Sequence, residues 1–129
     1  GNGVTKDSID AVATHCPNLR TVGMAFCKDV QSVASLARNC QLTSMSLTGL
    51  YTVDDDQIVA IAIACPKLSD VSLSFCKNIT DSSVIALAEN CPIRILDVSH
   101  DCVINDAGVI RLAESCHDLI ELDVGHTEG

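Results

Sequence analysis

Five cysteines recur at a nearly constant spacing along this 129-residue chain, and no other feature constrains the fold as strongly. They are Cys16, Cys40, Cys65, Cys91 and Cys116, which follow one another at steps of 24, 25, 26 and 25 residues. Self-similarity at a fixed period of roughly 20 to 50 residues is typical of repeat proteins, in which each unit packs only on its neighbours. The length suits one domain, so we expect a single repeat domain over residues 1–129.

Each cysteine is followed by a short segment in which apolar and polar residues alternate. Alternation with a period of two predicts a strand with one buried face. The apolar residues are Leu19, Val22 and Met24, then Leu42, Met45 and Leu47, then Leu68, Val71 and Leu73, then Ile93, Leu96 and Val98, and finally Leu119, Leu122 and Val124. We therefore expect five strands.

Before each cysteine, apolar residues recur at spacings of three and four, which places them on one face of a helix. They are Ile9, Val12 and Ala13, then Val33, Leu36 and Ala37, then Ile58, Ile61 and Ala62, then Val84, Leu87 and Ala88, and finally Val109, Leu112 and Ala113. Short polar residues at Asp54-Asp55-Asp56, Thr80-Asp81-Ser82 and Asn105-Asp106 can cap these helices. Calcium binding is the alternative for the first of these runs.

A unit of one strand and one helix, about 25 residues long and stacked about five times, is the pattern of leucine-rich repeats. The predicted fold class is α/β: a right-handed solenoid with a parallel sheet on its concave face and helices on its convex face. Because the pattern starts and stops inside a repeat, we expect the chain to be a segment of a longer solenoid.

One repeat resembles the cysteine-containing leucine-rich repeat of the F-box and leucine-rich-repeat family. It runs from Cys65-Pro66-Lys67-Leu68 through Val71-Ser72-Leu73-Ser74-Phe75-Cys76-Lys77-Asn78-Ile79-Thr80-Asp81 to Cys91. The resemblance covers nearly the whole chain, with local departures such as Leu50 in place of a loop cysteine and Cys102 one position late. It implies substrate recognition for an SCF-type ubiquitin ligase, with the adaptor held by an F-box that these residues do not include.

All eight cysteines fall at two positions of the repeat. Five lie at the corner between helix and strand, and Cys27, Cys76 and Cys102 lie in the loop after a strand. A thiol is small and weakly polar and fits a buried turn, and most successive repeats do not offer stacked cysteines the geometry of a disulfide. We therefore expect buried reduced thiols and a cytoplasmic or nuclear location, with disulfides or metal ligation as the alternatives.

Composition and motifs argue against several function classes. Eight Lys and Arg against 17 Asp and Glu give a net charge of −9, so we expect neither nucleic acid nor a membrane as partner. The longest apolar run, residues 58–65, is too short to span a membrane. The string Ser99-His100-Asp101 has the residue types of a hydrolase triad but not the separation that a triad requires. Without a Cys-x-x-Cys pair or a Gly-rich phosphate loop, we expect no enzyme, no metal and no cofactor.

The residues that alternate with the buried ones should face solvent on the concave face of the sheet. They are Thr21, Gly23 and Ala25, then Ser44, Ser46 and Thr48, then Asp70, Ser72 and Ser74, then Ile95, Asp97 and Ser99, and finally Glu121, Asp123 and Gly125. Asp70, Asp97, Glu121 and Asp123 would form an acidic patch there, able to attract a Lys or Arg of a partner. The alternative is that these charges only keep the surface soluble.

The loops that follow the strands form a second candidate surface. They carry Phe26, Tyr51, Phe75, His100 and His126 at or next to equivalent positions. Aromatic residues and His on one rim suit contacts with a partner. Alternatively, the phenylalanines pack against the neighbouring loop and hold adjacent repeats together.

Taken together, these patterns predict a non-catalytic scaffold that binds a protein partner on its concave face. The resemblance favours substrate recognition for a ubiquitin ligase, and the alternative is a stand-alone adaptor or assembly module unrelated to ubiquitination. A solenoid needs polar caps over its terminal core, and neither end of this chain supplies a good one, so self-association through the exposed ends is also expected.

Overall fold

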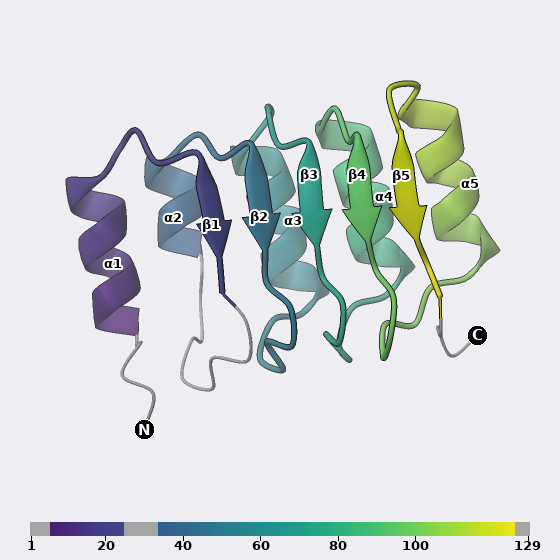
Figure 1. Ribbon diagram of the computed structural model, residues 1–129, viewed down its shortest axis with the longest axis horizontal. Coiled ribbons are helices and arrows are strands. Elements are labelled where there is room, and N and C mark those ends of the chain that lie inside the picture. The colour runs from purple at the N-terminus through teal and green to yellow at the C-terminus, as the bar shows by residue number, and fades with distance from the viewer. Residues whose placement is uncertain (1–5, 25–33, 126–129) are drawn as a thin grey trace.

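The computed structural model describes residues 6–24 and 34–125, in which short strands alternate with helices (Figure 1). The helices are α1 (Lys6–His15), α2 (Ala34–Asn39), α3 (Asp55–Ala64), α4 (Asp81–Asn90) and α5 (Asp106–Ser115). The strands are β1 (Thr21–Gly23), β2 (Ser44–Ser46), β3 (Asp70–Ser72), β4 (Ile95–Asp97) and β5 (Glu121–Asp123). The predicted alternation of strand and helix is confirmed.

The strands form one parallel sheet in the order β1-β2-β3-β4-β5. Its register follows the repeat, so that Val22, Met45, Val71, Leu96 and Leu122 are direct partners in turn. The five helices cover one face of this sheet, and all strands end at the same edge (Figure 1). The predicted α/β solenoid is therefore confirmed.

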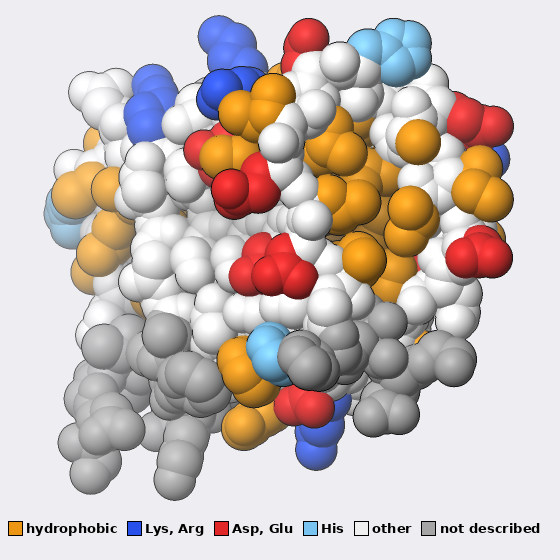
Figure 2. All heavy atoms as spheres, turned by 45° about the vertical axis from the view of Figure 1, so that its right-hand side comes forward, with side chains coloured by type: hydrophobic (Ala, Val, Ile, Leu, Met, Phe, Trp, Pro, Cys, Tyr) orange, Lys and Arg blue, Asp and Glu red, His pale blue; other side chains and the backbone are white. Residues whose placement is uncertain are grey.

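Apolar side chains from both layers fill the space between the sheet and the helices. In the central repeats, Val71 and Leu96 from the strands and Ile61 and Leu87 from the helices are all buried. The middle residues of the outer strands β1 and β5 are only half-buried, and Figure 2 shows apolar side chains at the surface of the C-terminal end. Each repeat is therefore fully shielded only where it has a neighbour on both sides.

The predicted core is wrong at positions on the terminal helices. Val12 of α1 and Ala113 of α5 are exposed, although they occupy the same helical face as buried residues of the central repeats. The reason is that a terminal helix has a neighbouring helix on one side only among the described residues. In that same part of the chain, no helix combines the length and the apolar composition needed to cross a bilayer.

The cysteines form two ladders of thiols that connect neighbouring repeats. At the helix-to-strand corner, the Cys91 thiol donates to the carbonyl of Cys65 at 3.5 Å. In the loop column, the Cys76 thiol donates to Leu47 O at 3.1 Å and the Cys102 thiol to Leu73 O at 3.2 Å. The thiols thus satisfy carbonyls at the turns of the preceding repeat.

The thiol interpretation is confirmed for the described cysteines. All seven are free, and all except Cys16, which lies at the N-terminal end, are buried. Burial raises the pKa of Cys91 and of Cys102 to about 12, so these thiols stay protonated at neutral pH. Cys27 lies outside the described residues.

Three consecutive acidic residues at the start of α3 have three different environments. Asp54 is the N-cap residue, and its Oδ1 accepts a hydrogen bond from the backbone of the first turn at 3.1 Å. Asp55 instead reaches the next repeat, where its oxygens accept hydrogen bonds from Thr80 and Ser83. Asp56 is exposed. The cap interpretation is confirmed for Asp54, and no group of residues suited to a metal ion is found within the described segments.

The loops that follow β2, β3 and β4 each contain a residue in the left-handed region of backbone space. Gly49 has a φ of 72°, and the equivalent residues Phe75 and His100 have φ values of 62° and 55°. The fourth repeat has a second such residue, Asp101, with a φ of 60°. This extra residue accounts for the late position of Cys102, whose thiol still reaches the same place in the turn as that of Cys76.

Replacing Asp101 by glycine is expected to stabilise the fold. Asp101 is exposed at a φ that disfavours residues with a Cβ atom, and glycine adopts that backbone without steric cost. We expect Asp101→Gly to raise the free energy of unfolding by about 0.5 kcal/mol in a urea titration. Asp101→Ala removes the same carboxylate without relieving the backbone, so an equal gain in that control would contradict the explanation.

Candidate protein-binding surface

The face of the sheet opposite the helices presents two rows of residues that cross all five strands. The first row contains the first residue of each strand, in the order Thr21, Ser44, Asp70, Ile95 and Glu121. The second row contains the last residue of each strand, in the order Gly23, Ser46, Ser72, Asp97 and Asp123. These residues are exposed or half-buried beside a more buried central residue, so the outward orientation predicted for both rows is confirmed.

In the third predicted outward row, the prediction is wrong at two positions, and Ala25 lies outside the described residues. Ser74 and Ser99 are buried, because the chain has already begun to turn after the strand. Ser74 Oγ donates to Thr48 Oγ1 at 3.3 Å, and Ser99 Oγ donates to Asp97 Oδ1 at 2.5 Å. These hydroxyls therefore stabilise the turns and are not offered to a partner.

Three carboxylates gather at the C-terminal end of this face. Asp97 and Asp123 are register partners in adjacent strands, and Glu121 lies beside them in the first row. Asp97 Oδ1 accepts a hydrogen bond from Ser99 N at 3.0 Å, and Asp123 Oδ1 accepts one from Gly125 N at 2.9 Å. We call Asp97, Glu121 and Asp123 the acidic cluster.

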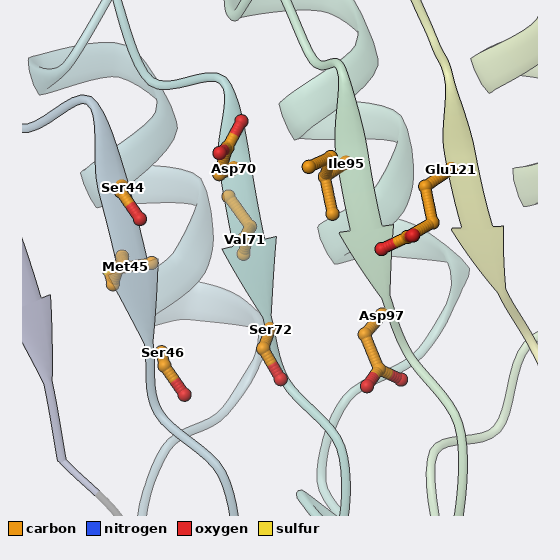
Figure 3. Close-up of a pocket in the computed structure, with 9 residues that line it drawn as sticks. All are labelled: Ser44, Met45, Ser46, Asp70, Val71, Ser72, Ile95, Asp97 and Glu121. Carbon is orange, nitrogen blue, oxygen red and sulfur yellow. The ribbon is translucent and has the colours of Figure 1, made fainter.

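Asp70 does not belong to this cluster, although the sequence places it in the same patch. Its Oδ1 lies 4.0 Å from Arg94 Nη1 and accepts a hydrogen bond from Ser69 Oγ at 3.0 Å. In the first row, Ile95 stands between Asp70 and Glu121 (Figure 3). The predicted patch is therefore divided into one ion-paired carboxylate and a cluster of three.

Ile95 is a residue of this site that sequence reasoning did not select. It is half-buried on the open face and lines, with Asp97 and Glu121, a shallow hollow of about 240 Å³ (Figure 3). The sequence does mark this position, because Ile95 is apolar where the equivalent residues of the other four strands are Thr, Ser, Asp and Glu. The hollow thus combines apolar surface with negative charge.

The predicted rim is used in part to hold adjacent loops together. The rings of Phe75 and His100 stack at a centroid distance of 4.4 Å with an interplanar angle of 5°. Tyr51 is 52% exposed, and the Lys77 ammonium lies 5.6 Å from the centre of its ring. The alternative in which Phe75 packs on the neighbouring loop is confirmed, and Tyr51 keeps an exposed face. Two other predicted rim residues, Phe26 and His126, lie outside the described residues.

The string Ser99-His100-Asp101 is not arranged as a catalytic triad. Ser99 donates its hydroxyl hydrogen to Asp97, His100 stacks on Phe75, and Asp101 is exposed. A nucleophile and its base must be within hydrogen-bond reach of one another, and the hydrogen bond of Ser99 is directed elsewhere. The three residues serve the turn after β4.

Comparisons with known proteins bear on the repeat itself. A family described as Leucine Rich repeat matches residues 64–88 and 89–113. Among solved structures, the tropomodulin C-terminal domain from Caenorhabditis elegans is similar, with a TM-score of 0.53 and 16% sequence identity. The similarity covers 94% of this chain, which spans 64% of the length of that structure. No curated protein matches the chain.

These matches identify the strand-helix unit as a leucine-rich repeat and the fold as a leucine-rich-repeat solenoid. At 16% sequence identity, the structural similarity shows the fold alone. Neither match shows similarity to the F-box and leucine-rich-repeat family, so that resemblance stays a prediction.

Proposed function

We propose that this leucine-rich-repeat protein is a scaffold that binds a basic segment of a protein partner on the open face of its sheet. The observation that carries the proposal is the placement of three carboxylates around Ile95 on a face without helices. Stacked repeats present an extended surface suited to protein partners. The acidic cluster makes one end of that surface favour positively charged groups of a partner.

The chemistry of the hollow matches a Lys or Arg side chain. Such a side chain has an apolar stem, which can lie on Ile95, and a charged tip, which can reach Asp97 and Glu121. Adjacent strands are about 4.8 Å apart, so one cation can lie near two carboxylates of neighbouring strands. A partner cation would also relieve the repulsion between Asp97 and Asp123, which are direct register partners.

Two finer functions are compatible with this scaffold. Substrate recognition for an SCF-type ubiquitin ligase is supported by the resemblance of the repeats, and a stand-alone adaptor or assembly module needs only the binding face. Direct binding of the full-length parent protein to a purified SCF adaptor subunit separates the two. Under either function we propose a cytoplasmic or nuclear location, which the free thiols support.

Neutralising the acidic cluster is expected to weaken the binding of basic peptides. In Asp97→Asn plus Asp123→Asn, the amide oxygens still accept the hydrogen bonds of the turns, but the charge is lost. We expect the dissociation constant of a labelled Arg-containing peptide to rise about tenfold, which corresponds to about 1.4 kcal/mol. Fluorescence anisotropy with that peptide and its Arg→Gln counterpart measures the change.

The matched control removes the same charge elsewhere. Glu114→Gln plus Asp118→Asn changes two exposed residues of α5 and the turn after it. We expect this variant to bind the Arg-containing peptide nearly as the wild type does. An equal loss in both variants would mean that affinity follows net charge alone, and the proposed site would be wrong.

A further inference from the structure

The outward side of α3 carries an exposed isoleucine at a position where the other four helices carry polar residues. This position lies two residues before the corner cysteine, and it is exposed in all five helices. In chain order, the residues there are Thr14, Arg38, Ile63, Glu89 and Glu114. Ile63 is 65% exposed, although α3 lies between α2 and α4 in the middle of the helix layer (Figure 1). The exposed apolar side chain is therefore a property of this helix and does not come from a missing neighbour.

Ile63 belongs to a longer apolar surface on the outer side of α3. Ala60 is exposed, and Val59 and Ala64 are half-buried. Residues 59 and 63 are four positions apart, as are residues 60 and 64, so they form two adjacent ridges on one side of the helix. We call Val59, Ala60, Ile63 and Ala64 the apolar strip.

The two ends of the apolar strip carry opposite charges. Asp56 is exposed in the first turn of α3, and Lys67 is exposed in the turn that follows the helix. Within the described residues, neither of them belongs to an ion pair. A surface that is acidic at one end, apolar in the middle and basic at the other end is complementary to itself in the reversed direction.

The apolar residues of the strip also match one another in an antiparallel pair of α3 helices. A two-fold axis between residues 61 and 62 brings residue 60 of one copy opposite residue 63 of the other, and residue 59 opposite residue 64. Ile63 then lies on Ala60 and Val59 lies on Ala64, so each large side chain meets a small one. Small residues at such a contact allow two helices to approach closely.

The charged ends give this contact its direction. The same two-fold axis brings Asp56 of each copy to Lys67 of the other, so opposite charges meet at both ends. A parallel arrangement would instead bring Asp56 to Asp56 and Lys67 to Lys67, and like charges at an interface are unfavourable. The antiparallel arrangement also places the positive N-terminal end of each helix dipole beside the negative C-terminal end of the other.

We propose that α3 is a dimerisation surface, on which a second copy of the chain packs its own α3 in the antiparallel direction. The occupant is a second copy because the strip pairs large with small residues and acidic with basic residues when it meets itself. Such a contact uses the same surface on both copies and closes at two. It lies on the helix side and leaves the open face of the sheet free, so the inference does not rest on the proposed binding of a basic segment. Two helices of ten residues meet over a small area, and we therefore expect a weak dimer.

Sedimentation velocity of the 129-residue chain over a range of concentrations tests the dimer. We expect the average mass to rise with concentration from that of a monomer and to level off at that of a dimer. A monomer at every concentration would mean that the apolar strip is left open or serves another partner, and would overturn the proposal. Growth beyond a dimer would show a contact that does not close, and would also overturn it.

Ile63→Glu tests the apolar part of the contact. The variant gives α3 the residue that α4 and α5 carry at the equivalent position, so we expect it to keep the circular dichroism spectrum of the wild type. Because the contact would bury the new carboxylate, we expect the dissociation constant of the dimer to rise tenfold or more. Ile110→Glu makes the same change at a residue of α5 that is 55% exposed, and this control should dimerise as the wild type does. Wild-type dimerisation of Ile63→Glu, or an equal loss in both variants, would overturn the proposal.

Charge reversal tests the antiparallel direction. Asp56→Lys and Lys67→Asp each place like charges at both ends of the contact, and we expect each to raise the dissociation constant about tenfold. The double variant restores opposite charges within one sequence, so it should dimerise as the wild type does. Lys77→Asp, which makes the same change as Lys67→Asp on an exposed loop residue after β3, should leave dimerisation unchanged. A double variant that dimerises no better than the single variants would show that Asp56 and Lys67 do not meet, and would overturn the proposed arrangement.

Discussion

Leu96→Ala should destabilise the protein by about 3 kcal/mol, close to the middle of the range for buried leucines. Leu96 is 1% exposed in the interior strand β4 and lies between Val71 and Leu122 in the register. Truncation removes apolar contacts and leaves a cavity that neighbouring repeats cannot close without losing their own packing. Urea unfolding followed by circular dichroism, at a concentration where the chain is monomeric, measures the loss.

Leu122→Ala is the matched comparison, because Leu122 is the register partner of Leu96 in the outer strand β5. It is only half-buried, so we expect a loss of about 1 kcal/mol, set mainly by the smaller apolar area removed from water. Ile63→Ala removes an aliphatic side chain that is 65% exposed and should change stability by less than about 0.5 kcal/mol. Equal losses for Leu96→Ala and Leu122→Ala would contradict the view that the C-terminal end is uncovered.

The repeat could be predicted from the sequence because three signals mark the same unit. These are the strand period of two, the helix spacing of three and four, and the corner cysteine between them. A strand shifted by one residue would turn Leu96 to solvent and Asp97 into the core, so alternation alone fixes which face each residue occupies. The same logic correctly places Asp97, Glu121 and Asp123 together on the open face. These are features that repeat from one unit to the next.

Features that depend on a single residue could not be predicted in this way. Ile95 is the one large apolar residue in its row, and the pairing of Asp70 with Arg94 follows from side-chain reach across two strands. The burial of Ser99 depends on where the chain turns. The left-handed backbone of Phe75 has no local signal in the sequence, since phenylalanine, unlike the equivalent Gly49, is not a residue type typical of that conformation.

Asp55 joins two repeats through side-chain hydrogen bonds that the repeat pattern does not predict. Removing its carboxylate should lower the free energy of unfolding by about 2 kcal/mol. Its Oδ1 accepts hydrogen bonds from Thr80 N at 2.9 Å and Ser83 Oγ at 2.6 Å, and its Oδ2 accepts one from Thr80 Oγ1 at 2.6 Å. Ser83 is buried, so Asp55→Ala leaves a buried hydroxyl without its acceptor. Asp56→Ala removes an exposed carboxylate from the same first turn and controls for the interaction with the helix dipole.

The contribution of Asp55 should depend on pH in a defined direction. Burial by itself raises the pKa of Asp55, but the hydrogen bonds from Ser83 and Thr80 outweigh it and hold the pKa below the ordinary value of 3.8. A carboxyl group with a lower pKa in the folded state stabilises the fold above its unfolded pKa. That stabilisation is lost as the pH falls through the folded pKa. The difference in unfolding free energy between wild type and Asp55→Ala should therefore be largest near pH 7 and shrink below about pH 4.

Urea titrations of wild type, Asp55→Ala and Asp56→Ala at several pH values separate this effect from general acid destabilisation. The wild type and Asp56→Ala should lose stability in parallel as the pH falls, because both keep the carboxylate that joins α3 to α4. Asp55→Ala should lose less stability over the same pH range, since the carboxylate whose protonation breaks the contact is already absent. A constant difference between wild type and Asp55→Ala from pH 7 to pH 3 would show that the ionised form of Asp55 does not stabilise the junction. The coupling of these two repeats would then rest on apolar packing and the thiol ladder alone.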